Sequence, residues 1–391
     1  MVPVRLQSLT LRAQSFTLRV PFLLRLARGH GANFPFMDKK RIVASVVVFL
    51  ILAFLLFLQY RHWQSFDWGT FWAQTHRIKK THVLHSVALI YIAYFMRAVR
   101  WKIFLQPVRP KVTSMDMVAP TLIGFAGLAL LGRAGEFIRP YLIARRTDLP
   151  FSSQLAVWAV ERIFDVGAFT VLMVLAIFLP SALPSIPHPE YYVRFREGGF
   201  LLIGVVLALT VGAIVIRRSG NAVAVWLETR FSHLSSNFGH KLAQKIREFG
   251  QGLDTIHGPL SLLMLTVVSV GMWYVIAIAY KEVTHSYGVA SLDIPVSQVL
   301  ILMGASMLGS MLQLPAVGGG SQMATIAALS TVFDVPPEMA ASCGILLWLV
   351  TFAAVIPLGL GFAHHERLSL RKLSEESHHA EEAELNGPLI E

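Results

Sequence analysis

Long uncharged stretches alternate with short charged loops along the chain. Stretches without any Lys, Arg, Asp or Glu reach or exceed the roughly 18–20 residues that a membrane-spanning helix needs. These stretches are Ile42–Tyr60, Pro259–Tyr280, Ile294–Phe333 and Met339–Ala363. Full spans are predicted over residues 42–60, 81–99, 154–180, 199–216, 259–280 and 339–363. The pattern therefore predicts an all-α integral membrane protein with about six full spans.

The composition supports this class and excludes others. Hydrophobic residues make up 54% of the chain and charged residues only 15%, which excludes an ordinary soluble domain. The formal net charge is +11, but the Lys and Arg residues sit in short loops and the aromatic residues lie within the spans. We therefore expect no nucleic-acid partner, because anionic lipid head groups are the natural counter-charge.

A first broken segment, residues 117–142, interrupts the pattern of spans. Its uncharged run Met117–Gly132 makes a helix of only about 24 Å, against a hydrocarbon core of about 30 Å. The run leads into Gly132–Pro140 (GRAGEFIRP), which brings together two arginines, a glutamate, two glycines and a proline. In lipid, such a break is tolerated only where protein buries it or where it lines a wet cavity.

A second broken segment, residues 295–333, contains Pro315 and Gly318–Gly320. Proline and glycines break a helix, and the freed backbone amides can face an anion or a lipid head group. Ser321 and Gln322 add neutral hydrogen-bonding groups. The segment is either re-entrant or crosses twice with a flexible turn between two spans. If both broken segments cross, the chain has about eight spans or more.

Loop charges orient the spans, because Lys and Arg favour the cytoplasmic side. They place both termini in the cytoplasm, together with the loop after the second span, which carries Arg100 and Lys102. Residues 61–80 disagree, since this basic loop falls outside. Both broken segments then enter and leave on one side, and the two halves of the chain have opposite orientations. This is the plan of inverted-repeat transporters, whose broken helices meet at the binding site.

The chain divides into three regions. Residues 1–40 are a basic N-terminal segment, which is either a surface segment or an untranslated stretch, since Met37 also resembles a natural start. Residues 41–363 form the multi-pass membrane domain. Residues 364–391 are polar and are expected to form a disordered cytoplasmic tail.

The first broken segment supplies three candidate ligands for a head group, Arg133, Glu136 and Arg139. Glu136 and Arg139 are three residues apart, so they would form an ion pair if both lay on one helix. The planar fork of an arginine side chain suits a phosphate group.

A second group of charges, Glu161, Arg162 and Asp165, lies inside a predicted span. Ionisable groups at this depth pair with one another or line a wet pathway. We expect Arg133 or Arg139 to face Glu161 or Asp165. The result is either a net basic pocket open to the cytoplasm or a buried brace that locks the broken segment to the next helix.

The sequence contains no nucleophile elbow, Walker loop, dinucleotide fingerprint or zinc pattern. Glu161 and Asp165 can in principle exchange protons, but Arg162 makes ion pairing the simpler account. His82 and His85 lie three residues apart, and we see no carboxylate that would complete a metal site with them. We therefore expect no catalytic residue, no metal and no cofactor, and a protein that is not an enzyme.

At these motifs the chain resembles the flippase-like membrane domain family of bacterial lysylphosphatidylglycerol synthases. The likeness rests on Gly132–Pro140, on Glu161–Asp165 (ERIFD) and on the Pro315–Gly320 turn, in matching order and spacing, over about residues 41–363. The resemblance implies a multi-pass helical architecture with re-entrant elements. It also implies a role in moving or handling lipids, including lipid-linked sugars.

Two features depart from this family. Its second turn is usually followed by a glutamate, whereas Gln322, Met323 and Ala324 occupy that stretch here, so no charged substrate contact is expected there. The family's soluble aminoacyl-transferring domain has no counterpart after Ala363, so we do not expect lysyl transfer to lipid.

We interpret the chain as a lipid translocator or lipid-handling protein of a bacterial cell (inner) membrane. The head group of a phospholipid or a polyprenyl-linked sugar would enter from the cytoplasm and bind the arginines of the first motif. Glu136, Glu161 and Asp165 would orient these arginines, and Gly318–Gly320 would form the opposing wall. The alternative is a non-transporting partner that presents lipid to a glycosyltransferase.

Overall fold

The computed structural model describes residues 66–178, 190–231, 239, 243, 244, 247, 258–311 and 319–386. All regular elements in these ranges are helices, as the sequence predicts. In chain order they are α4 (Trp68–His76), α5 (Lys80–Leu105), α6 (Ser114–Leu131), η1 (Gly132–Gly135), α7 (Ile138–Thr147), α8 (Phe151–Phe178), α9 (Glu190–Phe231), α11 (Gly258–His285), η2 (Ala290–Leu292), α12 (Val296–Met311), α13 (Gly319–Val332), α14 (Pro337–Trp348), the π-helical turn η3 (Leu349–Ala353), α15 (Val355–His365) and α16 (Leu370–Asn386).

Four helical stretches in the described residues are long and apolar enough to cross a membrane. They are α5, α6, α11 and the run Pro337–His365 formed by α14, η3 and α15. Helix α6 is the first arm of the broken segment 117–142; it is longer than the sequence predicted because it begins at Ser114, before the uncharged run. Large apolar side chains point outward from several helices, among them Leu84, Leu201 and Leu263, which are 68%, 70% and 59% exposed. Exposed apolar faces of this size suit contact with lipid. The chain is therefore a multi-pass helical membrane protein, while the predicted span 42–60 lies outside the described residues.

The second span extends further than the sequence analysis predicted. We expected it to end at residue 99 and Arg100 to lie in a cytoplasmic loop, but α5 continues to Leu105 and buries Arg100 completely. Arginine is a good helix former, so its presence does not end a helix. A buried arginine is tolerable where carboxylates pair with it, and α8 supplies them.

The first broken segment forms a tight helical hairpin. Helix α6 begins with a capping box between Thr113 and Asp116 and ends at Gly132, whose φ of 63° is in the left-handed region that favours glycine. Helix α7 then folds back along α6. A Cβ atom on Gly124 would lie 2.4 Å from the Cβ of Arg139, so only a glycine allows this close approach.

The second broken segment also folds back on itself. Helices α12 and α13 pack along each other, and a Cβ atom on Gly309 would lie 2.3 Å from the carbonyl oxygen of Gly320. The hydroxyls of Ser306 and Ser321 share a hydrogen bond of 2.8 Å between the two helices. Residues 312–318, which include Gly318, lie outside the described residues.

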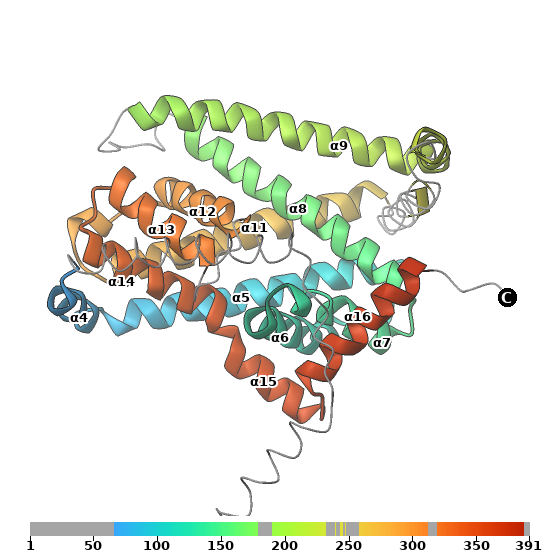
Figure 1. Cartoon of the computed structure of the whole chain (residues 1–391), viewed down its shortest axis with the longest axis horizontal. Helices are drawn as coiled ribbons and strands as arrows, with labels where there is room; N and C mark the ends of the chain where they lie inside the picture. Colours follow the sequence, from blue (N-terminus) through green and yellow to red (C-terminus); the bar gives the residue numbers. More distant parts are fainter. Residues whose placement is uncertain are drawn as a thin grey trace, which may run out of the picture. The chain divides into compact units, whose positions relative to one another are not determined.

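Helices from the first half of the chain pack on helices from the second half. Helix α5 packs on α11 along much of its length (Figure 1), while α8 packs on α12 and on α11. In return, α15 packs on α6, and η3 packs on α5. Several of these contacts therefore have a counterpart when α5, α6, α7 and α8 are exchanged with α11, α12, α13 and the α14–α15 run.

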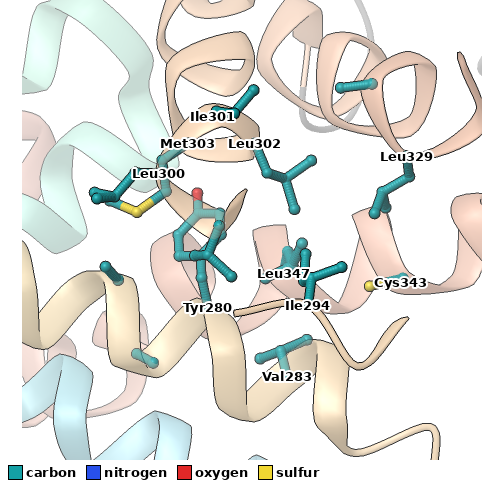
Figure 2. Packing of buried hydrophobic residues seen from close by; sticks show 14 of the residues in the cluster. Tyr280, Val283, Ile294, Leu300, Ile301, Leu302, Met303, Leu329, Cys343 and Leu347 are labelled. Atoms are coloured by element: carbon teal, nitrogen blue, oxygen red, sulfur yellow. The ribbon is translucent and has the colours of Figure 1, made fainter. Parts of the chain in front are cut away.

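The main apolar core lies in the second half. Figure 2 shows Tyr280 and Val283 of α11 near Leu347 of α14, and Leu300–Met303 of α12 above them, together with Leu329 of α13. A second cluster, around Trp101 and Phe104 of α5, joins α5 to α6, α7 and α8. This second cluster positions the charged side chains described below.

The C-terminal region differs from the expectation of a disordered tail. Leu370–Asn386 form helix α16, which packs on α6, α7 and α8. Leu373 is only 2% exposed and belongs to a small cluster with Ile138 and Leu142. The sequence did not indicate this helix, because the stretch is rich in glutamate and contains a single buried apolar residue, Leu373, that docks the helix. Residues 387–391 lie outside the described residues.

Candidate functional site

Two carboxylates lie one helical turn apart on the inner face of α8. Glu161 is completely buried and Asp165 is 4% exposed. They share a face because residues four apart on a helix are neighbours. Buried carboxylates are costly unless cations and hydrogen-bond donors surround them, so their partners define the site.

Arg100 of α5 bridges both carboxylates. One terminal nitrogen lies 2.7 Å from Oδ1 of Asp165 and donates to the hydroxyl of Ser269 on α11 at 3.0 Å. The other terminal nitrogen donates to Oε1 of Glu161. Because Arg100 has no exposed surface, it serves as an internal link between α5, α8 and α11.

Arg139 of α7 binds Glu161 with both terminal nitrogens, at 3.0 Å and 2.5 Å. The indole N–H of Trp101 donates to the same carboxylate at 3.0 Å. The guanidinium of Arg139 also lies over the rings of Trp101 and Phe125, at 5.2 Å and 5.0 Å from their centroids. Bidentate pairing and ring stacking are typical uses of arginine that lysine cannot replace.

Two further arginines complete the group. Arg97 of α5 lies 3.6 Å from Oδ2 of Asp165 without a hydrogen bond to it, and its guanidinium lies over Phe125 at 5.0 Å. Arg162 lies 3.3 Å from Oδ2 of Asp165 and is the accessible member, since its side chain is 45% exposed. Trp273 of α11 donates to Oδ1 of Asp165 at 3.2 Å.

This arginine cluster carries more positive than negative charge. Its cations are Arg97, Arg100, Arg139 and Arg162, and its anions are Glu161 and Asp165, so the formal sum is four minus two, or +2. In a low-dielectric environment such an excess attracts an anion strongly. The cluster therefore braces α5, α7 and α8 and carries a formal excess of positive charge.

A small pocket opens beside the cluster. It is lined by Gly124, Phe125, Leu128, Glu136, Arg139, Trp158 and Arg162. The wall is mostly apolar and aromatic, with the two arginines and Glu136 as the charged groups. The lining therefore combines aromatic rings with charged groups of both signs.

The structure brings together five of the ten site residues that the sequence singled out. Arg139 pairs with Glu161, as expected, and Arg162, Asp165 and Glu136 lie beside them. The expected Glu136–Arg139 ion pair is absent from the described contacts. Helix α7 begins only at Ile138, so the two residues do not share a helix, and Arg139 is occupied by Glu161.

The other predicted site residues either do not line the pocket or lie, wholly or with their side chains, outside the part of the chain that the structure describes. Arg133 lies in η1, and the position of its side chain is not described. Gly319 and Gly320 begin α13 and Gln322 follows on the same helix, and none of them lines the pocket. Gly318 lies outside the described residues.

Arg97 and Arg100 supply half of the cations in the cluster and were not predicted from the sequence as site residues. Both lie on one face of α5, three residues apart. Arg97 lies inside a predicted span, and an ionisable residue within a span is by default functional or paired. Because the span was predicted to end at residue 99, Arg100 was assigned to a loop, and the two arginines were not recognised as neighbours on one helix face.

The histidines also differ from expectation. We saw no carboxylate near His82 and His85, but Glu282 of α11 lies 2.7 Å and 3.8 Å from their Nδ1 atoms. Glu282 is distant from the two histidines in sequence, and it meets them because α5 and α11 are antiparallel neighbours. Within the described parts of the chain, no group of three such ligands has the geometry of a metal site.

Comparison with known proteins identifies the family. A family model described as the lysylphosphatidylglycerol synthase TM region matches residues 42–359. The chain belongs to this family. This confirms the resemblance seen at the Gly132–Pro140 and Glu161–Asp165 motifs.

A curated relative is similar at lower identity. The chain is 25% identical to "Glycosyltransferase AglD" of Haloferax volcanii over 316 residues, which cover 75% of this chain and 50% of the relative. The chain thus spans about half the length of that protein. No solved structure matches the chain. The family and this relative support a membrane function related to lipids.

Proposed function

We propose that this protein moves a membrane lipid whose head group carries a phosphate, either a phospholipid or a polyprenyl-linked sugar. The observation that carries the proposal is the +2 excess of the arginine cluster beside an open, partly aromatic pocket. A phosphate would supply the missing negative charge. The acyl or prenyl chains would lie against the apolar outer faces of the helices.

Arg162 and Arg139 are the residues that would bind the phosphate first. Both line the pocket, and the Arg162 side chain is 45% exposed while its nearest carboxylate oxygen is 3.3 Å away. Arg139 is held by Glu161, so its guanidinium is fixed before a ligand arrives. Arg97 and Arg100 are more deeply buried, and they would attract the phosphate electrostatically without contacting it.

The hairpins would provide the movement. Both are closed by glycine contacts without intervening side chains, at Gly124 against Arg139 and at Gly309 against Gly320. Helices packed through small residues can slide or separate with little repacking. We propose that the second hairpin, with Gly318–Gly320 and Gln322, forms a wall of the path that the head group follows.

The orientation of this arrangement follows from the loop charges. We propose that both broken segments are re-entrant and that the pocket opens to the cytoplasm, with both termini on that side of a bacterial inner membrane. Arg133 in the turn of the first hairpin would then meet incoming head groups.

An alternative role is presentation of lipid to a glycosyltransferase without transport. One observation favours it, because the relative aligned over half of its length is named a glycosyltransferase. In that case the same pocket would hold the head group, but the hairpins would not need to move. Copurification of an enzyme with this chain would support the alternative.

Reconstitution separates the two roles. The full chain is placed in phosphatidylcholine vesicles that contain acyl-labelled fluorescent phosphatidylglycerol, and an external quencher reports movement between leaflets. We expect Arg162→Gln and Arg139→Gln to slow movement at least tenfold, while Arg145→Gln, which removes an exposed arginine on α7, leaves it unchanged. Equal rates in all folded variants would overturn the role of the arginines, and a purified chain that moves no lipid would favour presentation.

A further inference from the structure

Helix α4 carries two exposed tryptophans beside a buried phenylalanine. Phe71 is 7% exposed, whereas Trp68 and Trp72 are 49% and 55% exposed. The rings pack edge to face, with centroids 5.8 Å apart for Trp68 and Phe71 and 5.2 Å apart for Phe71 and Trp72. Residues three and four apart share one side of a helix. The two indoles therefore flank Phe71 on one side of α4 and extend beyond the protein surface.

Packing on α14 fixes the orientation of α4. The hydroxyl of Thr75 shares a hydrogen bond of 2.8 Å with the hydroxyl of Ser342 on α14. At the start of α4, the side chain of Asp67 accepts from the backbone N–H of Thr70 at 3.1 Å and caps the helix. A helix of nine residues is not stable alone in water, so these contacts hold it in place.

Helix α4 lies across the beginning of α5 and not in line with it (Figure 1). The chain turns between the two helices, where the backbone N–H of Lys79 donates to the carbonyl of Ser286 at 2.9 Å. Because α5 is long and apolar enough to cross a membrane, a helix that lies across its end runs along the membrane surface. Leu84, in the first two turns of α5, is exposed, so the lipid-facing surface of the spans begins close to α4.

Three basic residues form the corner between α4 and α5. Arg77, Lys79 and Lys80 are all exposed, and no carboxylate pairs with them among the contacts of the described residues. The acidic residue of this segment, Asp67, lies at the other end of α4 and is hydrogen-bonded to Thr70. The corner is therefore a compact patch of positive charge beside exposed indole rings. It contains the charges that disagreed with the loop-charge rule in the sequence.

This combination of side chains matches the chemistry of the layer between lipid tails and water. Tryptophan is enriched in that layer, because its ring is apolar and its indole N–H is a hydrogen-bond donor. Lysine and arginine side chains near the membrane surface are attracted by anionic lipids. A lipid phosphate would neutralise charges that otherwise favour the cytoplasmic side.

We propose that α4 is an interfacial helix that anchors the beginning of α5 in a layer of anionic lipid head groups. Trp68 and Trp72 insert beside the protein into the interfacial layer, and the basic corner binds the phosphates. The anchor sets the depth of α5 in the bilayer. It explains how a basic segment lies on the side of the membrane that the loop charges assign to it. The proposal does not depend on the proposed lipid movement.

Fluorescence from two labelled positions on α4 tests whether the tryptophan side faces lipid. The full chain carries Cys343→Ala, which removes its one cysteine, and either Trp72→Cys or Thr70→Cys with an attached NBD fluorophore. Thr70 is the matched control, because it is exposed and lies about 160° around the helix from Trp72. The protein is placed in vesicles of phosphatidylcholine and phosphatidylglycerol that contain phosphatidylcholine with a nitroxide on its acyl chain.

We expect the nitroxide lipid to quench the label at position 72 at least about twofold more strongly than the label at position 70. Equal quenching at both positions would overturn the proposal. A label at position 72 that neither the lipid nor a water-soluble quencher reaches would also overturn it, because another protein surface would then cover this side of α4.

A second measurement needs no cysteine and keeps the aromatic rings. The fluorescence of the wild type minus that of Trp68→Phe/Trp72→Phe gives the emission of these two tryptophans. Brominated phosphatidylcholine should quench this emission if the indoles lie in the interfacial layer. Emission that the brominated lipid does not quench would contradict the proposal.

The label at position 72 also tests the basic corner. Nitroxide phosphatidylglycerol should quench it more strongly than nitroxide phosphatidylcholine at the same mole fraction, because anionic lipid gathers at the corner. Arg77→Gln/Lys80→Gln should remove most of this difference, while Lys102→Gln, near the other end of α5, should keep it. A difference that is absent from the wild type or that persists in the double variant would overturn the role of the basic residues. None of these measurements involves lipid movement, so their failure is distinct from a failure of the proposed function.

Discussion

Arg139 of α7 holds Glu161 of α8 through both terminal nitrogens of its guanidinium, at 3.0 Å and 2.5 Å. The pair fastens the returning arm of the first hairpin to the next helix. Arg100 and Trp101 of α5 donate to the same carboxylate, so three helices converge on one side chain. Glu161 is therefore the carboxylate that pairs with Arg100 and Arg139 at once. Removing its charge leaves these buried cations without their anion.

Glu161→Gln should destabilise the protein strongly. The amide keeps the shape but removes the charge that offsets Arg100 and Arg139, and breaking a buried pair costs about 3–5 kcal/mol. Thermal unfolding of the purified chain measures this loss. Glu136→Gln is the control, since Glu136 is only half-buried and no ion pair is described for it, and it should shift stability by less than about 0.5 kcal/mol. Equal shifts in both variants would contradict a central role of Glu161.

Arg100→Lys should be nearly as damaging as removal of the side chain. A lysine presents one ammonium group, which cannot bridge Glu161, Asp165 and Ser269 together. We expect a loss of about 2–5 kcal/mol in unfolding free energy. The reverse exchange on the same helix, Lys102→Arg, should leave the Tm within about 2 °C of wild type. A fully stable Arg100→Lys protein would show that the bridging geometry is dispensable.

Gly124→Ala should open the first hairpin. The added Cβ would lie 2.4 Å from the Cβ of Arg139, so α6 and α7 must separate or Arg139 must move away from Glu161. Gly167→Ala on α8 is the matched control, because nothing lies within 4 Å of its Cβ position, and alanine there should stabilise the helix by about 0.5–1 kcal/mol. Differential scanning fluorimetry of both variants gives the comparison. A Gly124→Ala protein as stable as Gly167→Ala would contradict the observed approach of the two helices.

How far the sequence predicted this arrangement depends on the kind of signal. The hydrophobic pattern located the apolar helices α5, α11 and Pro337–His365. GRAGEFIRP and ERIFD located Arg139, Glu161 and Asp165, because charges within apolar runs are conspicuous. The partner of each charge was harder to find. Arg100 was assigned to a loop, since a charge at the edge of an apolar run marks the end of a span as often as a buried pair.

Contacts between distant segments were beyond the reach of sequence patterns. Glu282 meets His82 only because α5 and α11 are antiparallel, and no local spacing records that. The C-terminal helix was also not predicted. Its packing depends on Leu373, which lies within a strongly acidic stretch.

Leu373→Asp should release α16 from the hairpin. Leu373 is 2% exposed against Ile138 and Leu142, and a buried, unpaired carboxylate there is unfavourable. The hydroxyl of Tyr141, which donates to Glu376 at 3.0 Å, would lose its partner. Limited proteolysis should then cut within residues 370–386 at least ten times faster than in the wild type. Arg371→Ala, which alters an 88% exposed side chain, should retain the wild-type rate, and similar cleavage of both variants would show that Leu373 does not dock the helix.

Native mass spectrometry tests the central claim, that the net basic pocket binds a phosphate-bearing head group. The purified chain is offered dioleoyl phosphatidylglycerol or dioleoylglycerol, which has the same acyl chains and no phosphate. We expect the wild type and Arg145→Gln to retain phosphatidylglycerol preferentially and Arg162→Gln to lose at least tenfold of that preference. Equal retention of both lipids by the wild type, or an undiminished preference in Arg162→Gln, would contradict it.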